Sequence, residues 1–252
     1  MRTVVVGASS GLGRCIGIGL AQRGGEVALL ARRQDRLDAA AAEAGEGTVA
    51  IACDVTDQVS VEKAIAQAAE QLGGIDALVF ASGVGTLGRL AELDADTWSR
   101  TLATNVTGAA LVTAAALPHL AASHGVAVYL SSVSASMTAP WPGLGAYIVS
   151  KAALDKLVEA LRVEHPEVGF TRLIVGDCAG GDGHGGTELP MAWDMDLAAE
   201  VAPAWIEKGL MSGSLIEVEE LVRVVDSVLH LGASASIPTV AVIPRAPAAP
   251  AG

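Results

Sequence analysis

The segment VVVGASSGLGR, residues 4–14, joins a run of valines to a glycine-rich loop. Glycines permit a tight turn and close approach of the backbone to a phosphate, and the N-terminus of a following helix offers N–H groups to that phosphate. Placed between a first strand and a helix, this loop predicts a dinucleotide site, although a glycine-rich turn without a ligand gives the same pattern. A mononucleotide P-loop is disfavoured because no Lys-Ser/Thr pair follows the glycines. The residues expected at the dinucleotide are Gly7, Ser9, Ser10, Gly11, Leu12 and Gly13.

Short apolar runs alternate with helical patterns along the rest of the chain. Runs without polar alternation are typical of strands that are buried on both faces. Strands that alternate with helices predict parallel pairing and right-handed crossovers, hence a doubly wound, mostly parallel Rossmann-type α/β sheet. We expect one domain over residues 1–245 and a flexible Pro/Ala-rich tail over 246–252. The seven predicted strands are Thr3–Val6, Val27–Ala31, Val49–Ala52, Ala77–Phe80, Val126–Leu130, Thr171–Val175 and Pro238–Ile243.

Composition narrows the class of protein. The 252 residues carry a net charge of -12, which argues against a nucleic-acid partner, because phosphate contacts need clustered Lys and Arg. No basic and apolar leader precedes the first strand, and the longest apolar stretch, 109–117, is about half a membrane span. We therefore expect a cytoplasmic protein without a membrane partner. The spacing of Cys15, Cys53 and Cys178 indicates no metal site.

The end of the second predicted strand discriminates between dinucleotide cofactors. An NAD(H) site usually carries an acidic residue there, which bonds the ribose 2′-hydroxyl. This chain has Ala31 followed by Arg32 and Arg33. A guanidinium can bind a 2′-phosphate, whereas an acid would repel it. The sequence therefore favours NADP(H) over NAD(H), with a solvated helix start as the alternative interpretation.

The segment YIVSK places Tyr147 and Lys151 four residues apart, so that on a helix both side chains share a face. By itself this spacing is a weak signal, since an exposed pair fits it equally well. A neighbouring ammonium favours the phenolate, so we expect Lys151 to lower the pKa of Tyr147. Such a phenol would serve as a general acid or base.

Taken with the glycine loop, these motifs resemble the short-chain dehydrogenase/reductase family over about residues 3–175. CDVTD places Asp54 and Val55 after the third strand, where the resemblance implies contacts with the adenine. The segment after the fourth strand supplies Ala81, Ser82 and Gly83 to the cofactor.

The resemblance also implies a catalytic set of Asn105, Ser132, Tyr147 and Lys151. Tyr147 would exchange a proton with the substrate oxygen, a serine would hold that oxygen, and Lys151 would also bond the nicotinamide ribose. Asn105 would prop open a helix and hold a water. Strand context favours Ser132 as the serine, whereas the family's usual spacing to the tyrosine favours Ser134.

Several positions depart from the family pattern. Val6 replaces the usual threonine before the first glycine, and Phe80-Ala81-Ser82-Gly83 replaces Asn-Asn-Ala-Gly. Asp177-Cys178 stands where Pro-Gly is usual, and the threonine that follows has only a distant candidate in Thr187. These changes leave the predicted fold intact but weaken the transfer of nicotinamide contacts.

Residues 176–213 are the expected substrate loop or lid, and their glycines favour mobility. Asp182 and His184 form no coordination sphere, so we expect no metal. The thiol of Cys178 is a minor candidate for a redox role. Some large apolar residues of this region should line a substrate pocket and others should be core: Met191, Trp193, Trp205, Leu210 and Met211.

The expected activity is therefore NADP(H)-dependent interconversion of a small-molecule ketone or aldehyde and an alcohol by hydride transfer. The resemblance further implies a homodimer or homotetramer. Two alternatives stay open at this point: a non-catalytic dinucleotide-binding sensor or scaffold, and an isomerase or dehydratase on the same fold.

Overall fold

The computed structural model describes residues 1–180, 190 and 193–245, and within them all seven predicted strands form. The predicted tail lies outside the described residues, and so do residues 181–189 and 191–192 of the predicted lid. The fifth strand runs on to Ser132, two residues further than predicted, and the last strand is shorter than predicted. The strands are β1 (Arg2–Val6), β2 (Glu26–Ala31), β3 (Val49–Ala52), β4 (Ala77–Phe80), β5 (Val126–Ser132), β6 (Gly169–Val175) and β7 (Thr239–Val242).

The strands form one sheet in the order β3-β2-β1-β4-β5-β6-β7, and every neighbouring pair is parallel. The chain builds outward from β1 to β3 and then returns to place β4 on the other side of β1. The strand order thus reverses between β1 and β4, and ligands of such sheets bind in the crevice at the carboxyl ends of the strands there. The predicted doubly wound sheet is confirmed.

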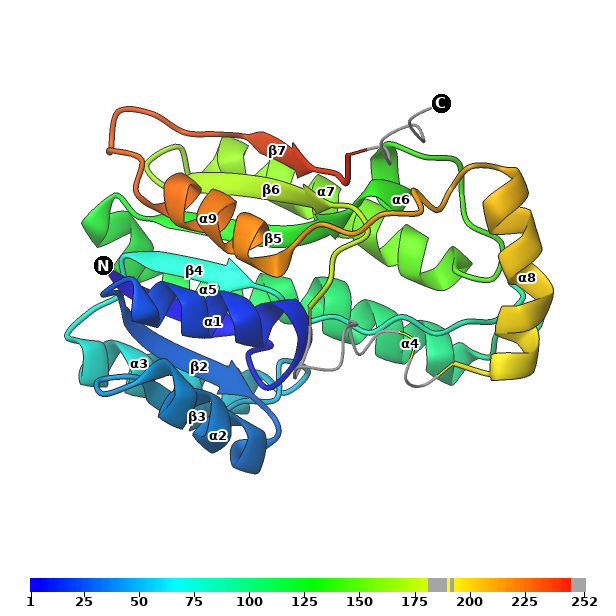
Figure 1. The fold of residues 1–252 in the computed structure, drawn as a ribbon. Helices are drawn as coiled ribbons and strands as arrows, with labels where there is room; N and C mark the ends of the chain where they lie inside the picture. Colours follow the sequence, from blue (N-terminus) through cyan, green and yellow to red (C-terminus); the bar gives the residue numbers. More distant parts are fainter. Residues whose placement is uncertain (181–189, 191–192, 246–252) are drawn as a thin grey trace.

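Helices cover both faces of the sheet (Figure 1). The buried residues of α1, α2 and α9 pack with one face, and those of α3, α5 and α7 pack with the other. The main helices are α1 (Gly11–Gln22), α2 (Gln34–Ala44), α3 (Gln58–Leu72), α4 (Ala95–Leu102), α5 (Gly108–Ser123), α6 (Val133–Ser136), α7 (Gly145–Glu164), α8 (Met195–Glu207) and α9 (Val218–Leu229).

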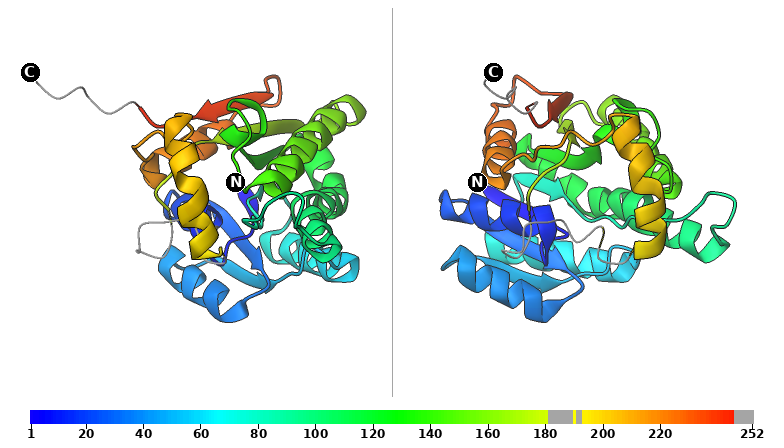
Figure 2. Two further views of the ribbon diagram at one scale, coloured as in Figure 1. Left: turned by 90° about the vertical axis from the view of Figure 1, so that its right-hand side faces the viewer. Right: turned by 45° about the vertical axis from the view of Figure 1, so that its right-hand side comes forward.

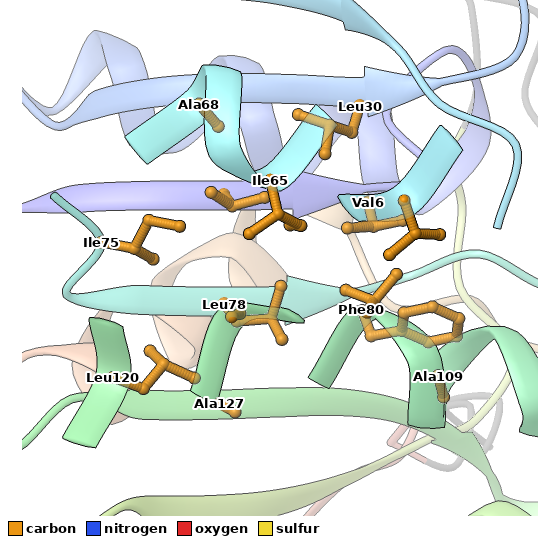
Figure 3. Packing of buried hydrophobic residues seen from close by; sticks show 14 of the residues in the cluster. Val6, Leu30, Ile65, Ala68, Ile75, Leu78, Phe80, Ala109, Leu120 and Ala127 are labelled. Atoms are coloured by element: carbon orange, nitrogen blue, oxygen red, sulfur yellow. The ribbon is translucent and has the colours of Figure 1, made fainter. Parts of the chain in front are cut away.

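Alternate side chains of each strand enter the two cores, as the pleat requires. Figure 3 shows the core on the side of α3 and α5, where Val6, Leu78 and Phe80 of the central strands meet Ile65 and Ala109 of the helices. Small and branched aliphatic residues let the helices pack closely on the sheet, as the aromatic content of 3% suggests. Packing on both faces of the sheet holds the carboxyl ends of the strands in place, and the candidate site lies at those ends.

A π-helical segment, η1 (Ala103–Thr107), joins α4 to α5 in one continuous helix. By length and apolar composition alone, the helix Ala95–Ser123 is able to cross a membrane, although the same test is passed by core helices of soluble proteins. Its residues Ala109, Val112 and Leu120 are fully buried against the sheet, and 33% of its most apolar window is buried.

The helix α8 stands at the end of the molecule toward which the strands point (Figures 1 and 2). It belongs to a third apolar cluster, separate from the two faces of the sheet, which includes Leu87, Leu144, Ile148 and Trp205. The carboxyl ends of the strands are therefore covered on one side by α8, and the candidate site lies at that end.

Candidate active site

The loop between β1 and α1 is shaped by glycines at which no side chain fits. Gly7 has φ +87°, and a Cβ there would lie 2.6 Å from the backbone nitrogen of Ser82. A Cβ on Gly13 would lie 2.4 Å from the carbonyl oxygen of Gly7. The backbone of the loop therefore contacts other backbone atoms directly. The first N–H groups of α1 have no partner within the helix and are available to a ligand at the loop. This geometry fits a pyrophosphate, the group for which the sequence predicts the loop.

Arg33 lies against this glycine loop. Its guanidinium donates to the hydroxyl of Ser9 through Nε at 3.2 Å and Nη2 at 3.0 Å, and Nη2 donates to the hydroxyl of Ser10 at 2.7 Å. Arg32 is exposed and lies near Asp54 instead. Of the two arginines that the sequence nominates, Arg33 is therefore the one that joins the end of β2 to the phosphate loop.

Asp54 and Val55 follow β3 as predicted. The Oδ1 atom of Asp54 accepts from Thr56 N at 2.9 Å and from Thr56 Oγ1 at 2.7 Å. Burial opposes ionisation of Asp54, but these two bonds and the charge of Arg32 outweigh it and lower the pKa of the carboxyl group. Val55 is buried against Gly108 at the start of α5. Both residues are thus held firmly at the strand end where the adenine is predicted.

The residues after β4 connect the phosphate loop with Lys151. Ala81 N donates to Val6 O at 2.9 Å, which continues the β1–β4 pairing past the strand end. Gly83 is exposed, and a Cβ there would lie 3.4 Å from Lys151 Nζ and 3.6 Å from Asn105 Oδ1. A Cβ at position 83 would thus make ordinary contact with both groups. The glycine that the family pattern places here therefore lies directly beside Lys151 and Asn105.

Asn105 lies at the centre of η1 and is fully buried. Its Oδ1 accepts from Val84 N, and its Nδ2 donates to Val84 O and to Ser150 Oγ, each at 2.8 Å. Ser150 Oγ in turn donates to Tyr147 O at 2.7 Å. The side chain therefore ties the segment after β4 to the first turn of α7. Its place in a widened helical turn agrees with the helix-opening role that the resemblance implies, and the expected water is not tested.

Tyr147 and Ser132 are brought together by the meeting of α7 with the end of β5. The Ser132 hydroxyl lies close enough to the Tyr147 phenol to act on its pKa, and it lies 2.9 Å from the Ser134 hydroxyl. Ser134 is buried behind it in the short helix α6. The structure thus places Ser132 directly beside the phenol and Ser134 one step further away, in agreement with the strand context.

Lys151 is 5% exposed, and its Nζ donates to Leu130 O at 2.7 Å. The same Nζ lies over the Tyr147 ring, 5.8 Å from the ring centroid. Burial lowers the pKa of Lys151 to about 8, and the nearby carboxylate of Asp155 partly offsets that effect. Lys151 therefore loses its charge close to neutral pH.

The sequence-based expectation that Lys151 lowers the pKa of Tyr147 is wrong for the protein by itself. Loss of hydration raises the pKa of the half-buried Tyr147, and the neighbouring Ser132 hydroxyl only partly opposes the rise. The physical reason is that the charged form of a phenol in this position is poorly hydrated, while the Lys151 ammonium faces the ring and Leu130 O. At neutral pH Tyr147 is therefore a neutral phenol, the form that can donate a proton.

Three tryptophans gather beside Tyr147 in the third apolar cluster. The ring centroids of Trp141 and Trp193 lie 5.4 Å and 5.9 Å from that of Trp205. Their indole N–H groups donate to Thr138 Oγ1, Gly85 O and Pro142 O. The side chains thus present carbon surface, with their donors already engaged, next to the phenol.

The predicted pocket residues divide between core and surface. Trp205 and Leu210 are buried in this cluster, Trp193 packs on it, Met211 is exposed, and Met191 lies outside the described residues. Trp141 was missed, although its place in the loop just before the Tyr147 segment was a usable signal.

The departure at Asp177-Cys178 has a structural explanation. Asp177 Oδ2 accepts from Ser212 N at 3.2 Å and from Ser212 Oγ at 2.9 Å, which ties the end of β6 to the segment before α9. The thiol of Cys178 is buried, and burial raises its pKa to about 12. A thiol of this kind is protonated at neutral pH, which disfavours the minor redox hypothesis for Cys178.

Comparisons with known proteins agree with this geometry. Residues 2–177 match the protein family described as short chain dehydrogenase. A glycine betaine reductase of Emericella nidulans is 38% identical over 165 residues, which cover 64% of this chain and 13% of that protein. A meso-2,3-butanediol dehydrogenase of Serratia marcescens is 32% identical over 163 residues, which cover 64% of each protein. The chain thus spans less than two thirds of the length of these relatives.

Solved structures share the fold along nearly the whole chain. An alcohol dehydrogenase from the archaeon Thermococcus sibiricus, complexed with 5-hydroxy-NADP, has a TM-score of 0.78 and 26% identity. The alignment covers 95% of this chain and 94% of that one.

Proposed function

The chain belongs to the short-chain dehydrogenase/reductase family, and from this premise we propose that it is an NADP(H)-dependent oxidoreductase. It interconverts a small-molecule ketone or aldehyde and an alcohol, with Tyr147 as the general acid or base. The observation that carries the proposal is the meeting of Tyr147, Ser132 and Lys151 beside Gly83, at the end of the sheet where the phosphate loop lies.

Each side chain of this group has a distinct task in carbonyl reduction. The segment around Gly83 and Lys151 would hold the nicotinamide, which would supply the hydride when bound, so that negative charge would develop on the substrate oxygen. The Ser132 hydroxyl donates to that oxygen, and Tyr147 gives it a proton. The neutral phenol that burial favours is the form that this step needs, so reduction is supported at neutral pH and oxidation at higher pH. Asn105 keeps Gly83 and α7 in their relative places.

The preference for NADP(H) rests on Arg33. The cofactor fits the residues present, because the loop leaves no room for side chains at Gly7 and Gly13 and a guanidinium lies beside two hydroxyls at its edge. Arg33, Ser9 and Ser10 together offer a cation and two hydrogen-bonding groups to a 2′-phosphate. The adenine side is assigned to Asp54 and Val55.

Replacing Arg33 tests the cofactor assignment. Arg33→Gln should weaken NADPH binding by about 10- to 150-fold, the equivalent of one charge-assisted bond. NADH binding should change less than about three-fold, because NADH has no 2′-phosphate. Arg36→Gln, which replaces an exposed arginine in the first turn of α2, serves as the control. Equal losses for the two cofactors, or equal efficiency of the unaltered protein with both, would reject the preference for NADP(H).

A panel of ketones, aldehydes and alcohols with both cofactors, followed by nicotinamide absorbance, tests the activity. Tyr147→Phe should bind NADPH normally and lose at least about 100-fold in turnover. Turnover that survives this change, or that is absent from the unaltered protein, favours the sensor or scaffold. Conversion of substrate without stoichiometric NADPH oxidation favours the isomerase or dehydratase.

The tryptophan surface beside Tyr147 supports substrates with an apolar or aromatic portion, since the indole N–H groups are already bonded to the protein. A homodimer or homotetramer and a cytoplasmic location are part of the same proposal.

A further inference from the structure

A buried polar cluster lies behind the catalytic lysine, between α7 and the strands β5 and β6. It consists of Asp155 on α7, Ser131 on β5 and Arg172 on β6. Asp155 and Ser131 are each 5% exposed. Ser131 precedes Ser132 on β5. The Ser131 hydroxyl lies near the carboxyl group of Asp155, and the Ser132 hydroxyl lies near the phenol of Tyr147.

Arg172 holds the carboxylate in place. Its Nη1 lies 3.3 Å from Asp155 Oδ2 and 3.6 Å from Glu159 Oε1. Glu159 is much more exposed than Asp155 and also pairs with Lys156 at the surface. Asp155 is thus the inner carboxylate of the cluster and Glu159 the outer one.

The cluster is not built for stability. Ser131 Oγ, Asp155 Oδ1 and Arg172 Nε are buried, and no well-formed hydrogen bond reaches them within the described residues. Each buried polar atom left in that state costs about 1–3 kcal/mol. A buried salt bridge is itself weak evidence for stability, because desolvation offsets the attraction. A cluster that costs free energy at this position calls for another explanation.

That explanation is the position of the cluster relative to the reacting groups. Tyr147, Lys151 and Asp155 follow one another at intervals of four residues on α7, so they form one stripe along the helix. Lys151 stands in the middle, with the phenol on one side and the carboxylate on the other. The carboxylate favours the charged form of Lys151, while burial disfavours it.

We propose that Asp155 is a positioning residue for the reaction: held by Arg172 behind β5, its carboxylate keeps the buried Lys151 ammonium charged and in place beside Tyr147. This inference rests on the proposed oxidoreductase function. Asp155 touches neither the substrate side nor the cofactor side of the site, and it acts only through Lys151.

The charged groups around Lys151 and Asp155 determine the direction in which the pKa of Lys151 should change when the carboxylate is removed. Lys151 and Glu159 flank Asp155 on α7, Arg172 faces it from β6, and Arg162 adds a more distant positive charge. Burial raises the pKa of Asp155, and the two cations with the Ser131 hydroxyl only partly offset this. Removing the carboxylate leaves the buried Lys151 without the negative charge that favours its ammonium form, so the ammonium should lose its proton at a lower pH.

The charge of Lys151 can be measured directly, because the sequence has only four lysines, Lys63, Lys151, Lys156 and Lys208. In the full chain labelled with lysine carrying ¹³Cε, the signal of the buried Lys151 should titrate near its pKa of about 8. Asp155→Asn should lower the Lys151 midpoint by about one pH unit. Glu159→Gln removes the outer carboxylate, which lies on the same helix and faces the same arginine. This change should shift the Lys151 midpoint by less than about 0.3 pH unit.

The catalytic consequence is a shifted pH profile. In Asp155→Asn, kcat/KM for NADPH-dependent reduction should start to fall at a pH about one unit lower than in the unaltered protein. The variant should be about five-fold slower than the unaltered protein at pH 8 and nearly equal to it at pH 6. Asp155→Glu should restore the profile. An unshifted Lys151 midpoint in Asp155→Asn, or a loss of rate that is equal at all pH values, would overturn the proposal.

The unaltered protein provides a test if Asp155→Asn does not fold. Its Lys151 signal should show a second step at acid pH, where Asp155 takes up a proton, and a single-step titration would overturn the proposal. The lysine titration needs no substrate. A shifted midpoint in a protein without any carbonyl reductase activity would therefore reject the proposed function and leave the coupling between Asp155 and Lys151 standing.

Discussion

Replacing Asn105 should both destabilise the protein and loosen the site. The side chain is fully buried and makes three hydrogen bonds of 2.8 Å, two to Val84 and one to Ser150. In Asn105→Ala, the backbone N–H and C=O of Val84 and the hydroxyl of Ser150 all lose a partner. Val84 adjoins Gly83, whose place beside Lys151 depends on this connection.

The magnitude follows from those three bonds. Each buried polar group left unpaired costs about 1–3 kcal/mol, and Val84 is only half-buried, so part of its loss is recovered by water. We therefore expect Asn105→Ala to lower the free energy of unfolding by about 3–5 kcal/mol. That loss is a large part of the free energy of unfolding of a typical domain, which is about 5–15 kcal/mol.

Urea unfolding at a fixed protein concentration measures the loss, and fluorescence titration with NADPH measures the effect on the site. Ser150→Ala is the matched control, because it leaves both bonds to Val84 intact. It removes the third bond and the bond from Ser150 Oγ to Tyr147 O, and it should cost about 1–2 kcal/mol. Asn105→Asp keeps the size of the side chain but cannot donate when ionised, so it should cost at least as much as the alanine. A loss below about 1 kcal/mol in Asn105→Ala, or one equal to that of Ser150→Ala, would refute the reasoning.

Three further predictions address the reacting groups and the phosphate loop. Ser132→Ala should lower kcat for carbonyl reduction by about 100-fold or more, and Ser134→Ala by less than about ten-fold; the reverse order in steady-state kinetics would identify the other serine. Because Lys151 is charged only below its pKa of about 8, kcat/KM for reduction should fall as the pH rises through that value. Lys151→Arg should move the fall to higher pH, and an unchanged profile would exclude Lys151 as its cause. Gly13→Ala would place its Cβ 2.4 Å from a backbone oxygen of the loop, so NADPH binding should be lost in calorimetry. The control is Gly232→Ala, since nothing within 4 Å would meet its Cβ; equal affinities of the two variants would contradict the role of the loop.

The fold followed from local patterns. The run of valines ending at Gly7, and six later apolar runs, sufficed to predict seven strands, because a strand buried on both faces needs an unbroken apolar sequence. The glycines at 7 and 13 were recognisable for a similar reason, since contact between backbones excludes every other residue. The spacing of Tyr147 and Lys151 on one helical face was also evident from the sequence.

The long-range contacts were not predictable in the same way. Whether Ser132 or Ser134 approaches the phenol depends on where β5 ends and α6 begins, and spacing along the chain cannot decide that. Arg33, rather than Arg32, reaches the phosphate loop because of the direction in which the chain leaves β2.

The sequence by itself determined the sheet, the phosphate loop and the residue types of the site, because these depend on periodicity and on steric limits that act over a few residues. Only the tertiary structure decided the ionisation of Tyr147 and Lys151 and revealed the carboxylate of Asp155 behind them. Ionisation depends on burial and on charges contributed by separate elements, and those distances exist only once the helices have packed on the sheet.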